Sequence, residues 1–246
     1  MSIRNTDADW RAIGSSEPYF GVLTDPAFLK RNLTDSATQQ FYRSGGHDVE
    51  WTVDTIKNRF DASFRPAHVI DFGCGVGRCS FFLVQHADRV TGVDVSPAML
   101  AIAEQERTAR GLSAIRFGDS LPDEPAQWVF SYFVFQHILP ARGYGLLRDL
   151  LARLATGGIA SIQLTAYREP NHLAGSLYDV GLGRFDGETL DVIAPVENPA
   201  VGQMQMYDYD IGRVLPIFAS CGIHATWMFH VDYNGHHGYW IFGRKE

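Results

Sequence analysis

The feature that most constrains the fold of this chain is an apolar segment that leads directly into a glycine-rich loop. The stretch VIDFGCGVGR, residues 69–78, has glycine at positions 73, 75 and 77 and an acid, Asp71, just before them. A short apolar run bounded by turn residues is typical of a buried strand, and glycine lets the loop backbone approach a bound molecule closely. The stretch therefore predicts a strand followed by a cofactor-binding loop.

Strand-like and helix-like segments alternate along the chain around and after this loop. Strands are expected at 68–72, 89–95, 114–119, 128–133 and 159–166, and helices at 78–87, 96–110 and 142–158. Strands that alternate with helices in this way predict a parallel sheet with helices on both faces.

The end of the chain breaks this alternation. A helix-like segment at 209–222 precedes two strand-like segments, 224–232 and 238–245, which only the five residues YNGHH connect. Five residues are too few for a crossover, so these two strands must pair antiparallel, with Asn234-Gly235 as the hairpin turn. We therefore predict a mostly parallel sheet of seven strands in which the last strand is reversed.

Helix-like segments also precede the first strand, and a long stretch rich in Gly and Pro follows the fifth. We predict an N-terminal helical cap region at residues 1–66 and a core at residues 67–246. A long connection without regular structure inside a compact domain is usually functional. We therefore interpret the stretch 167–206 as a substrate lid inserted into the core.

The spacing of the glycines bears on the identity of the cofactor. The dinucleotide fingerprint is G-x-G-x-x-G, and its third glycine would fall at Arg78 or at Ser80, depending on the frame. Without that glycine, a pyrophosphate on the helix N-terminus is less favoured. A phosphate-binding P-loop also requires Gly-Lys-Ser/Thr after the loop, and this chain has none there.

Several motifs occur in a fixed order along the chain. They are VIDFGCGVGR (69–78), VTGVDVS (90–96), FGDS (117–120), GGIASIQL (157–164) and the closing hairpin, preceded upstream by PYFGVLT (18–24) and FYRSGG (41–46) and accompanied by FSYFVFQHI (130–138). In this order they resemble the class I S-adenosylmethionine-dependent methyltransferases, of the bacterial small-molecule type. The resemblance implies a Rossmann-like α/β fold, and S-adenosyl-L-methionine as the cofactor, with S-adenosyl-L-homocysteine as its product.

The resemblance also implies which residues contact this cofactor. Asp94 would accept hydrogen bonds from the ribose hydroxyls, unless it only places charge at a helix N-terminus. Asp119 would accept from the adenine amino group, unless it is simply a turn former. The expected cofactor-contacting residues are Asp71, Gly73, Cys74, Gly75, Gly77, Asp94, Val95, Met99, Asp119, Ser120, Tyr132, Tyr42 and Ser44.

Methyl transfer needs little from the protein beyond orientation and exclusion of water. His137 follows the fourth predicted strand at the carboxyl edge, where ligands bind such sheets, and an ordinary histidine pKa of about 6.5 suits a general base. A role in positioning the substrate, or in capping a helix, stays open for this residue. The candidate substrate-binding residues are Gln136, Tyr167, Tyr178, His236 and His237. The histidine spacing matches no metal-site pattern, so we predict no metal.

Composition narrows the choice of acceptor and of compartment. A formal net charge of −7 disfavours nucleic acid as the partner. The segment SYFVFQ, 131–136, also lacks the motifs by which methyltransferases of nucleic acids and of protein arginine are known, so the default acceptor is a small molecule, most simply a hydroxyl on a sugar or natural product. The alternatives are N-methylation of a small amine, a dinucleotide-dependent oxidoreductase, and a non-catalytic cofactor-binding module. Three cysteines without metal spacing, and no signal peptide or membrane-spanning run, predict a cytoplasmic protein. The sequence does not predict the oligomeric state.

Overall fold

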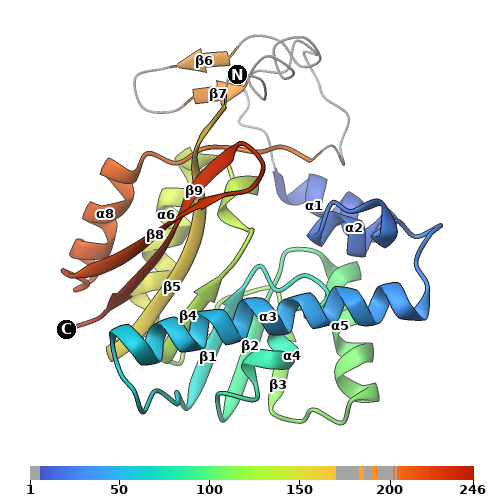
Figure 1. Ribbon diagram of the computed structural model, residues 1–246, viewed down its shortest axis with the longest axis horizontal. Helices are drawn as coiled ribbons and strands as arrows, with labels where there is room; N and C mark the ends of the chain where they lie inside the picture. Colours follow the sequence, from blue (N-terminus) through green and yellow to red (C-terminus); the bar gives the residue numbers. More distant parts are fainter. Residues whose placement is uncertain (1–5, 170–182, 186–189, 193–201, 203) are drawn as a thin grey trace.

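A seven-stranded sheet forms the centre of the computed structural model, which describes residues 6–169, 183–185, 190–192, 202 and 204–246 (Figure 1). The strands lie in the order β3-β2-β1-β4-β5-β9-β8. Their bounds are β1 His68–Phe72, β2 Arg89–Val93, β3 Ile115–Gly118, β4 Ala126–Ser131, β5 Leu154–Arg168, β8 Thr226–Asp232 and β9 His236–Arg244. The strands β1 to β5 pair in parallel, whereas β9 pairs antiparallel with both β5 and β8. The predicted sheet with a reversed last strand is confirmed.

The closing hairpin turns where the sequence predicted. Asn234 and Gly235 have positive φ values of 56° and 87°, the combination that a two-residue type I′ turn requires. The backbone groups of Tyr233 and His236 bond to each other across the turn. This geometry brings the hairpin tip to the carboxyl edge of the parallel strands.

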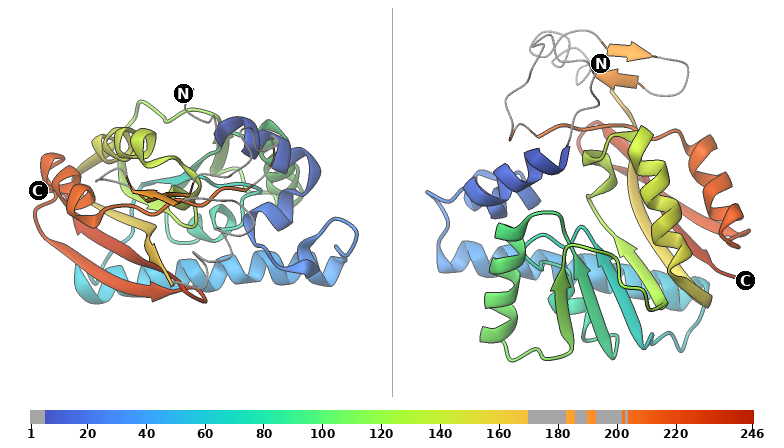
Figure 2. Two further views of the ribbon diagram at one scale, coloured as in Figure 1. Left: turned by 90° about the horizontal axis from the view of Figure 1, so that it is seen from above. Right: turned by 180° about the vertical axis from the view of Figure 1, so that it is seen from behind.

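Helices cover both faces of the sheet. Their bounds are α1 Thr6–Ser16, α2 Pro18–Val22, η1 Pro26–Phe28, α3 Asp35–Arg59, α4 Ser80–Leu83, α5 Pro97–Ala109, η2 Phe135–His137, α6 Pro140–Ala152 and α8 Ile211–Ser220. The long helix α3 crosses one face, and α6 and α8 cover the other (Figures 1 and 2). Alternate residues of β1 supply the two cores, because Val69 packs in the cluster that includes α3 and Ile70 in the cluster that includes α6 and α8.

Two predicted helices are shorter in the structure than the sequence indicates. The helix expected at 78–87 is a single α-helical turn, because three-residue bonds such as Phe82 N–H to the Cys79 carbonyl tighten the segment. The helix expected at 142–158 ends at Ala152, and β5 begins at Leu154 rather than at residue 159. Here Gly157 N–H donates to the Lys245 carbonyl, so pairing with the C-terminal strand overrides the local helical pattern.

The predicted division into domains remains a prediction. Residues of α3, including Phe41, Val49 and Ile56, share one hydrophobic cluster with Trp128 and Phe242 of the sheet. The N-terminal helices therefore help to form the core.

Most of the predicted lid, 167–206, lies outside the described residues, as does Tyr178. Within that stretch the structure describes a two-stranded ribbon of β6, Gly183–Phe185, and β7, Leu190–Val192. Among the described residues, no helix is both long enough and apolar enough to cross a membrane.

Candidate functional site

A pocket opens at the carboxyl ends of β1, β2 and β4, beneath the N-terminal helices. Trp10 of α1 and Val22 of α2 form part of its wall. The predicted site residues that line it are Asp71, Gly73, Cys74, Gly75, Asp94, Val95, Met99, Asp119, Tyr132 and His137. Residues from several separate segments of the sequence thus meet in one cavity.

The glycine loop takes a backbone conformation that side chains disfavour. Gly73, Gly75 and Gly77 have φ values of 77°, 53° and 83°. A Cβ at Gly73 would lie 2.2 Å from a methyl carbon of Val134. Backbone N–H groups of Gly73 and Cys74 both donate to the Val93 carbonyl, at 2.7 and 3.1 Å. The loop is therefore fixed to the end of β2 and exposes its backbone to the pocket.

Asp94 joins this loop to the start of α5. Its Oδ2 accepts from Gly75 N–H at 2.9 Å, and its Oδ1 accepts from Ser96 N–H at 2.8 Å. Burial raises the pKa of Asp94, and the backbone donors oppose that rise. The two carboxylate oxygens together have four lone pairs, more than the backbone donors of Ser96, Gly75 and Val95 use, so Asp94 can hold the loop and still accept from a ligand hydroxyl.

Asp71 lies deeper, beneath the loop. It is 2% exposed and accepts from the Ser80 hydroxyl at 2.5 Å. Burial raises the pKa of Asp71 to about 6, although the Ser80 hydrogen bond and the Arg78 charge lower it. Asp71 thus links the end of β1 to the start of α4.

His137 belongs to η2, the short helix after β4, and both of its ring nitrogens are engaged. Nδ1 lies 2.9 Å from the Gln205 carbonyl, which can only accept, so Nδ1 carries the proton. Nε2 is then the acceptor of a 3.3 Å bond from the Gln136 amide. Burial lowers the pKa of His137 to about 4. The pKa of His137 is therefore lower than the ordinary value of about 6.5 expected from the sequence, because the ring is buried. The ring is neutral at physiological pH.

Some predicted residues lie outside the pocket lining. Tyr42 and Ser44 lie on α3, behind the loop: the Tyr42 hydroxyl donates to the Val76 carbonyl at 3.4 Å, and Ser44 Oγ accepts from Arg78 at 3.1 Å. Their contact with the cofactor stays a prediction. The other predicted residues that the described lining does not include are Gly77, Ser120, Gln136, Tyr167, His236 and His237.

The hairpin residues form a group of their own at the rim. The rings of Tyr167 and His237 stack with centroids 4.5 Å apart, and Tyr167 is 49% exposed. Glu169, Asp232 and His237 bring one potential ligand atom each within 4.8 Å of one another, but both carboxylates are exposed. The expectation that the protein has no metal site stays a prediction.

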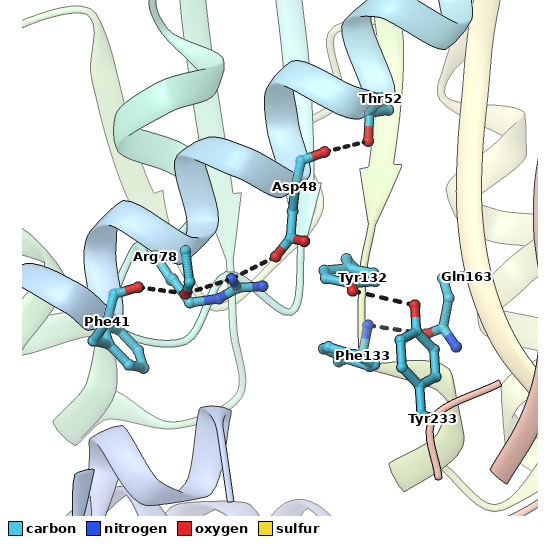
Figure 3. Close-up of polar contacts among 9 residues, drawn as sticks. Phe41, Asp48, Thr52, Arg78, Tyr132, Phe133, Gln163 and Tyr233 are labelled. Atoms are coloured by element: carbon cyan, nitrogen blue, oxygen red, sulfur yellow. Dashed lines mark hydrogen bonds and ion pairs between the residues drawn. The ribbon is translucent and has the colours of Figure 1, made fainter. Parts of the chain in front are cut away.

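Sequence reasoning missed a polar group between α3 and the hairpin (Figure 3). Arg78 Nη1 donates to Asp48 of α3 at 2.6 Å, and the Tyr132 and Tyr233 hydroxyls lie 3.1 Å apart. A signal for part of this group was present in FYRSGGHD, residues 41–48, because Ser44 and Asp48 are four residues apart and share one helix face. Arg78, which bonds to that face, was noted in the sequence only because it stands where the dinucleotide fingerprint requires a glycine. Nothing in the sequence indicated its contact with α3.

Comparisons with known proteins agree with these features. A family model described as a methyltransferase domain matches residues 69–158. The chain is similar to the trans-aconitate 2-methyltransferase of Rhizobium etli, with 32% identity over 108 residues, which are 43% of this chain and 41% of that protein. The matched segment thus spans less than half of this relative.

Solved structures share the fold over more of the chain. The magnesium protoporphyrin IX methyltransferase of Synechocystis, with bound S-adenosylmethionine, has a TM-score of 0.64 and 14% identity, covering 100% of both chains. The 1,6-didemethyltoxoflavin-N1-methyltransferase of Burkholderia thailandensis, with bound S-adenosylhomocysteine, has a TM-score of 0.58 and 17% identity, covering 100% of this chain and 92% of that one. At these identities the likeness is one of fold.

Proposed function

Since the chain belongs to the class I S-adenosylmethionine-dependent methyltransferases, we propose that it transfers the methyl group of S-adenosylmethionine to a hydroxyl oxygen of a small molecule. The observation that carries the proposal is the loop that Asp94 holds. Left-handed glycines expose backbone to the pocket, and an acid with free lone pairs stands at the end of β2.

The residues of the pocket fit the parts of this cofactor. Gly73 and Gly75 provide a wall without side chains for the methionine part, and Asp94 provides an acceptor for the ribose hydroxyls. Val95 and Met99 provide apolar surface for the adenine, and Asp119 provides an acceptor at the end of β3. When bound, the cofactor supplies a methyl carbon that its sulfonium has already activated.

The protein's contribution to the reaction is then orientation and exclusion of water. His137 is suited to orientation, because its Nδ1 proton and its Nε2 lone pair are both engaged and its ring is buried. A pKa of about 4 makes it a weak proton acceptor. We therefore propose that His137 shapes the acceptor side of the pocket by holding Gln136 and the segment of Gln205 in place, and the alternative role as general base becomes an outcome of the test.

Two observations support a small acceptor. The relatives named above act, according to their names, on trans-aconitate, magnesium protoporphyrin IX and 1,6-didemethyltoxoflavin. The formal net charge of −7 leaves no basic surplus for a nucleic-acid backbone. We propose oxygen as the methylated atom because the pocket wall includes neutral polar groups, such as the Tyr132 hydroxyl, which suit a hydroxyl-bearing acceptor.

The first test is calorimetric titration with S-adenosylhomocysteine and with NAD. We expect binding of S-adenosylhomocysteine only, and preferential binding of NAD would overturn the proposal in favour of an oxidoreductase. The second test is a screen of sugars, phenols and small amines, with release of S-adenosylhomocysteine as the readout. Turnover with amines alone would replace O-methylation by N-methylation, and cofactor binding without any turnover would favour a non-catalytic module.

The role of His137 is tested with an acceptor from that screen. We expect His137→Asn to keep kcat within a few-fold and His137→Ala mainly to raise the acceptor KM, with cofactor affinity unchanged in both. The wild-type rate should be flat from pH 7 to pH 9, because the His137 ring is already neutral and Asp71, with a pKa of about 6, is already ionised. A loss of kcat of roughly 10²- to 10⁴-fold in His137→Asn would instead identify a general base.

A further inference from the structure

The guanidinium of Arg78 is buried but only half engaged. Arg78 is 4% exposed. Its Nη1 donates to Asp48 Oδ2 at 2.6 Å (Figure 3). The same Nη1 also donates to Ser44 Oγ at 3.1 Å. In the part of the chain that the structure describes, no residue accepts a hydrogen bond from Nε or Nη2. A guanidinium has five donors in a fixed fork, so an entire edge of this one is left for another partner.

The position of Arg78 is set by a close approach of helix α3. A Cβ at Gly45 would lie 2.2 Å from the Arg78 carbonyl oxygen and 2.9 Å from its Cγ. Only glycine therefore allows α3 to pack on this residue. On the other side, the guanidinium carbon lies 5.6 Å from the centroid of the Tyr132 ring. The Arg78 side chain has little freedom to rotate, because Nη1 is bonded to α3 and the guanidinium lies against the Tyr132 ring.

Arg78 lines the same pocket as the glycine loop, and its Nε and Nη2 are the guanidinium nitrogens that the bonds to α3 leave for a ligand. Arg78, Gly73 and Gly75 all line that pocket. The other arginine in the described lining, Arg142, is bonded to Asp7 of α1. Among the lining residues, Arg78 thus provides a buried cation beside the part of the wall that has no side chains.

We propose that Arg78 binds the α-carboxylate of the cofactor's methionine part through Nε and Nη2, and that Ser44 and Asp48 are positioning residues for its guanidinium. This inference rests on the cofactor of the proposed function. The Nε–Nη2 edge presents two parallel donors, which match the two oxygens of a carboxylate. The α-carboxylate is the anionic group of the cofactor, and an anion in a buried site requires a paired cation.

A pair of ligands separates this role from a general effect on the pocket. S-adenosylhomocysteine carries the α-carboxylate, whereas 5′-methylthioadenosine has the same adenosine and thioether without the amino-acid end. We expect Arg78→Met to weaken S-adenosylhomocysteine about 10- to 100-fold, the usual range for a lost hydrogen bond to a charged group. The affinity for 5′-methylthioadenosine should change less than about two-fold, because the lost contact is absent from that complex.

Further variants control for charge, position and folding. Arg142→Met should leave the ratio of the two affinities unchanged, because that guanidinium is held elsewhere. Arg78→Lys should recover part of the lost affinity, since it restores the charge but not the two parallel donors. Arg78→Met leaves Asp48 without its partner, so the double variant Asp48→Asn/Arg78→Met should show the same ligand selectivity with less risk of unfolding.

The outcomes distinguish this inference from the proposed function. If Arg78→Met, or the double variant, weakens both ligands equally, Arg78 is structural and the inference is wrong. If neither variant changes the affinity for S-adenosylhomocysteine, the inference is also wrong. If the wild-type protein binds neither ligand, the proposed function fails, and the inference fails with it.

Discussion

The two sides of the pocket are built in different ways. On the side proposed to bind the cofactor, here called the cofactor side, Asp94 holds Gly75 across a sequence separation of 19 residues. On the side proposed to bind the acceptor, here called the acceptor side, His137 bonds to Gln205 across 68 residues. Tyr132, expected from the sequence to contact the cofactor, meets Tyr233 of the hairpin across 101 residues. One side is thus formed within a single β-α-β unit, whereas the other exists only when distant segments have docked. Local geometry gives the first side its rigidity, and tertiary packing gives the second its shape.

The two sides also differ in how burial changes their ionisable groups. On the cofactor side, burial raises the pKa of Asp71 to about 6 and also raises that of Asp94. On the acceptor side, burial lowers the pKa of His137 to about 4. Desolvation disfavours the charged form in both cases, so it makes the acids weaker and the histidine a weaker base.

The largest effect is expected from Gly73→Ala, which challenges the rigidity of the cofactor side. The new Cβ would overlap Val134, and the left-handed backbone would add about 1–2 kcal/mol of strain. Because the loop must move, we expect affinity for S-adenosylhomocysteine to fall by more than about 100-fold in calorimetry.

Gly145→Ala in α6 is a matched control, because a Cβ there meets nothing within 4 Å. It should bind the ligand as the wild type does. Near-normal binding by Gly73→Ala would mean that the loop tolerates rearrangement and that the contrast in rigidity is wrong.

A smaller effect is expected from Asp94→Ala. The substitution removes the acceptor for Gly75 and Ser96 and the proposed acceptor for the ribose. A hydrogen bond to a charged group contributes about 1.5–3 kcal/mol, so affinity for S-adenosylhomocysteine should fall about 10- to 100-fold. Asp88→Ala, at a side chain that is 66% exposed, is the control. Unchanged affinity in a folded Asp94→Ala protein would remove the ribose assignment.

The smallest effect is expected from His137→Asn on the acceptor side, and it is measured as a change in how the free energy of unfolding depends on pH. The folded-state pKa of His137 lies below its ordinary value of 6.5, so the unfolded chain binds a proton first as pH falls. The contribution of the neutral ring is therefore present above pH 6.5 and lost as pH falls toward 4. By linkage, the free energy of unfolding should drop by about 2 kcal/mol more between pH 7 and pH 5 than in His137→Asn.

Denaturant unfolding of both proteins at pH 7 and pH 5 measures that difference. An identical pH dependence in the two proteins would show that the ring is not shielded from water. The acceptor side would then be open in solution, and the comparison with the buried acids of the cofactor side would no longer hold.

The sequence was sufficient where a structural feature depends on neighbours along the chain. Asn234-Gly235 predicts its turn because both residues tolerate positive φ, and Ser96-Pro97 predicts the start of α5 because a cap and a proline favour a first helical turn. The glycine loop and Asp94 could be found for the same reason, since a strand, a loop and the next strand end are close in sequence. The boundary between α6 and β5 was predicted wrongly because pairing with β9, far along the chain, decides it.

Only the tertiary structure decided the environment of each side chain. The sequence by itself determined the sheet with its reversed last strand, the glycine loop and the acids at the strand ends, because periodicity and turn chemistry are local properties. It did not determine that burial would lower the pKa of His137. Nor did it determine that Ser44 and Asp48 of α3 would accept hydrogen bonds from Arg78. Desolvation and ion pairing depend on which segments meet in space, and no single segment encodes its neighbours.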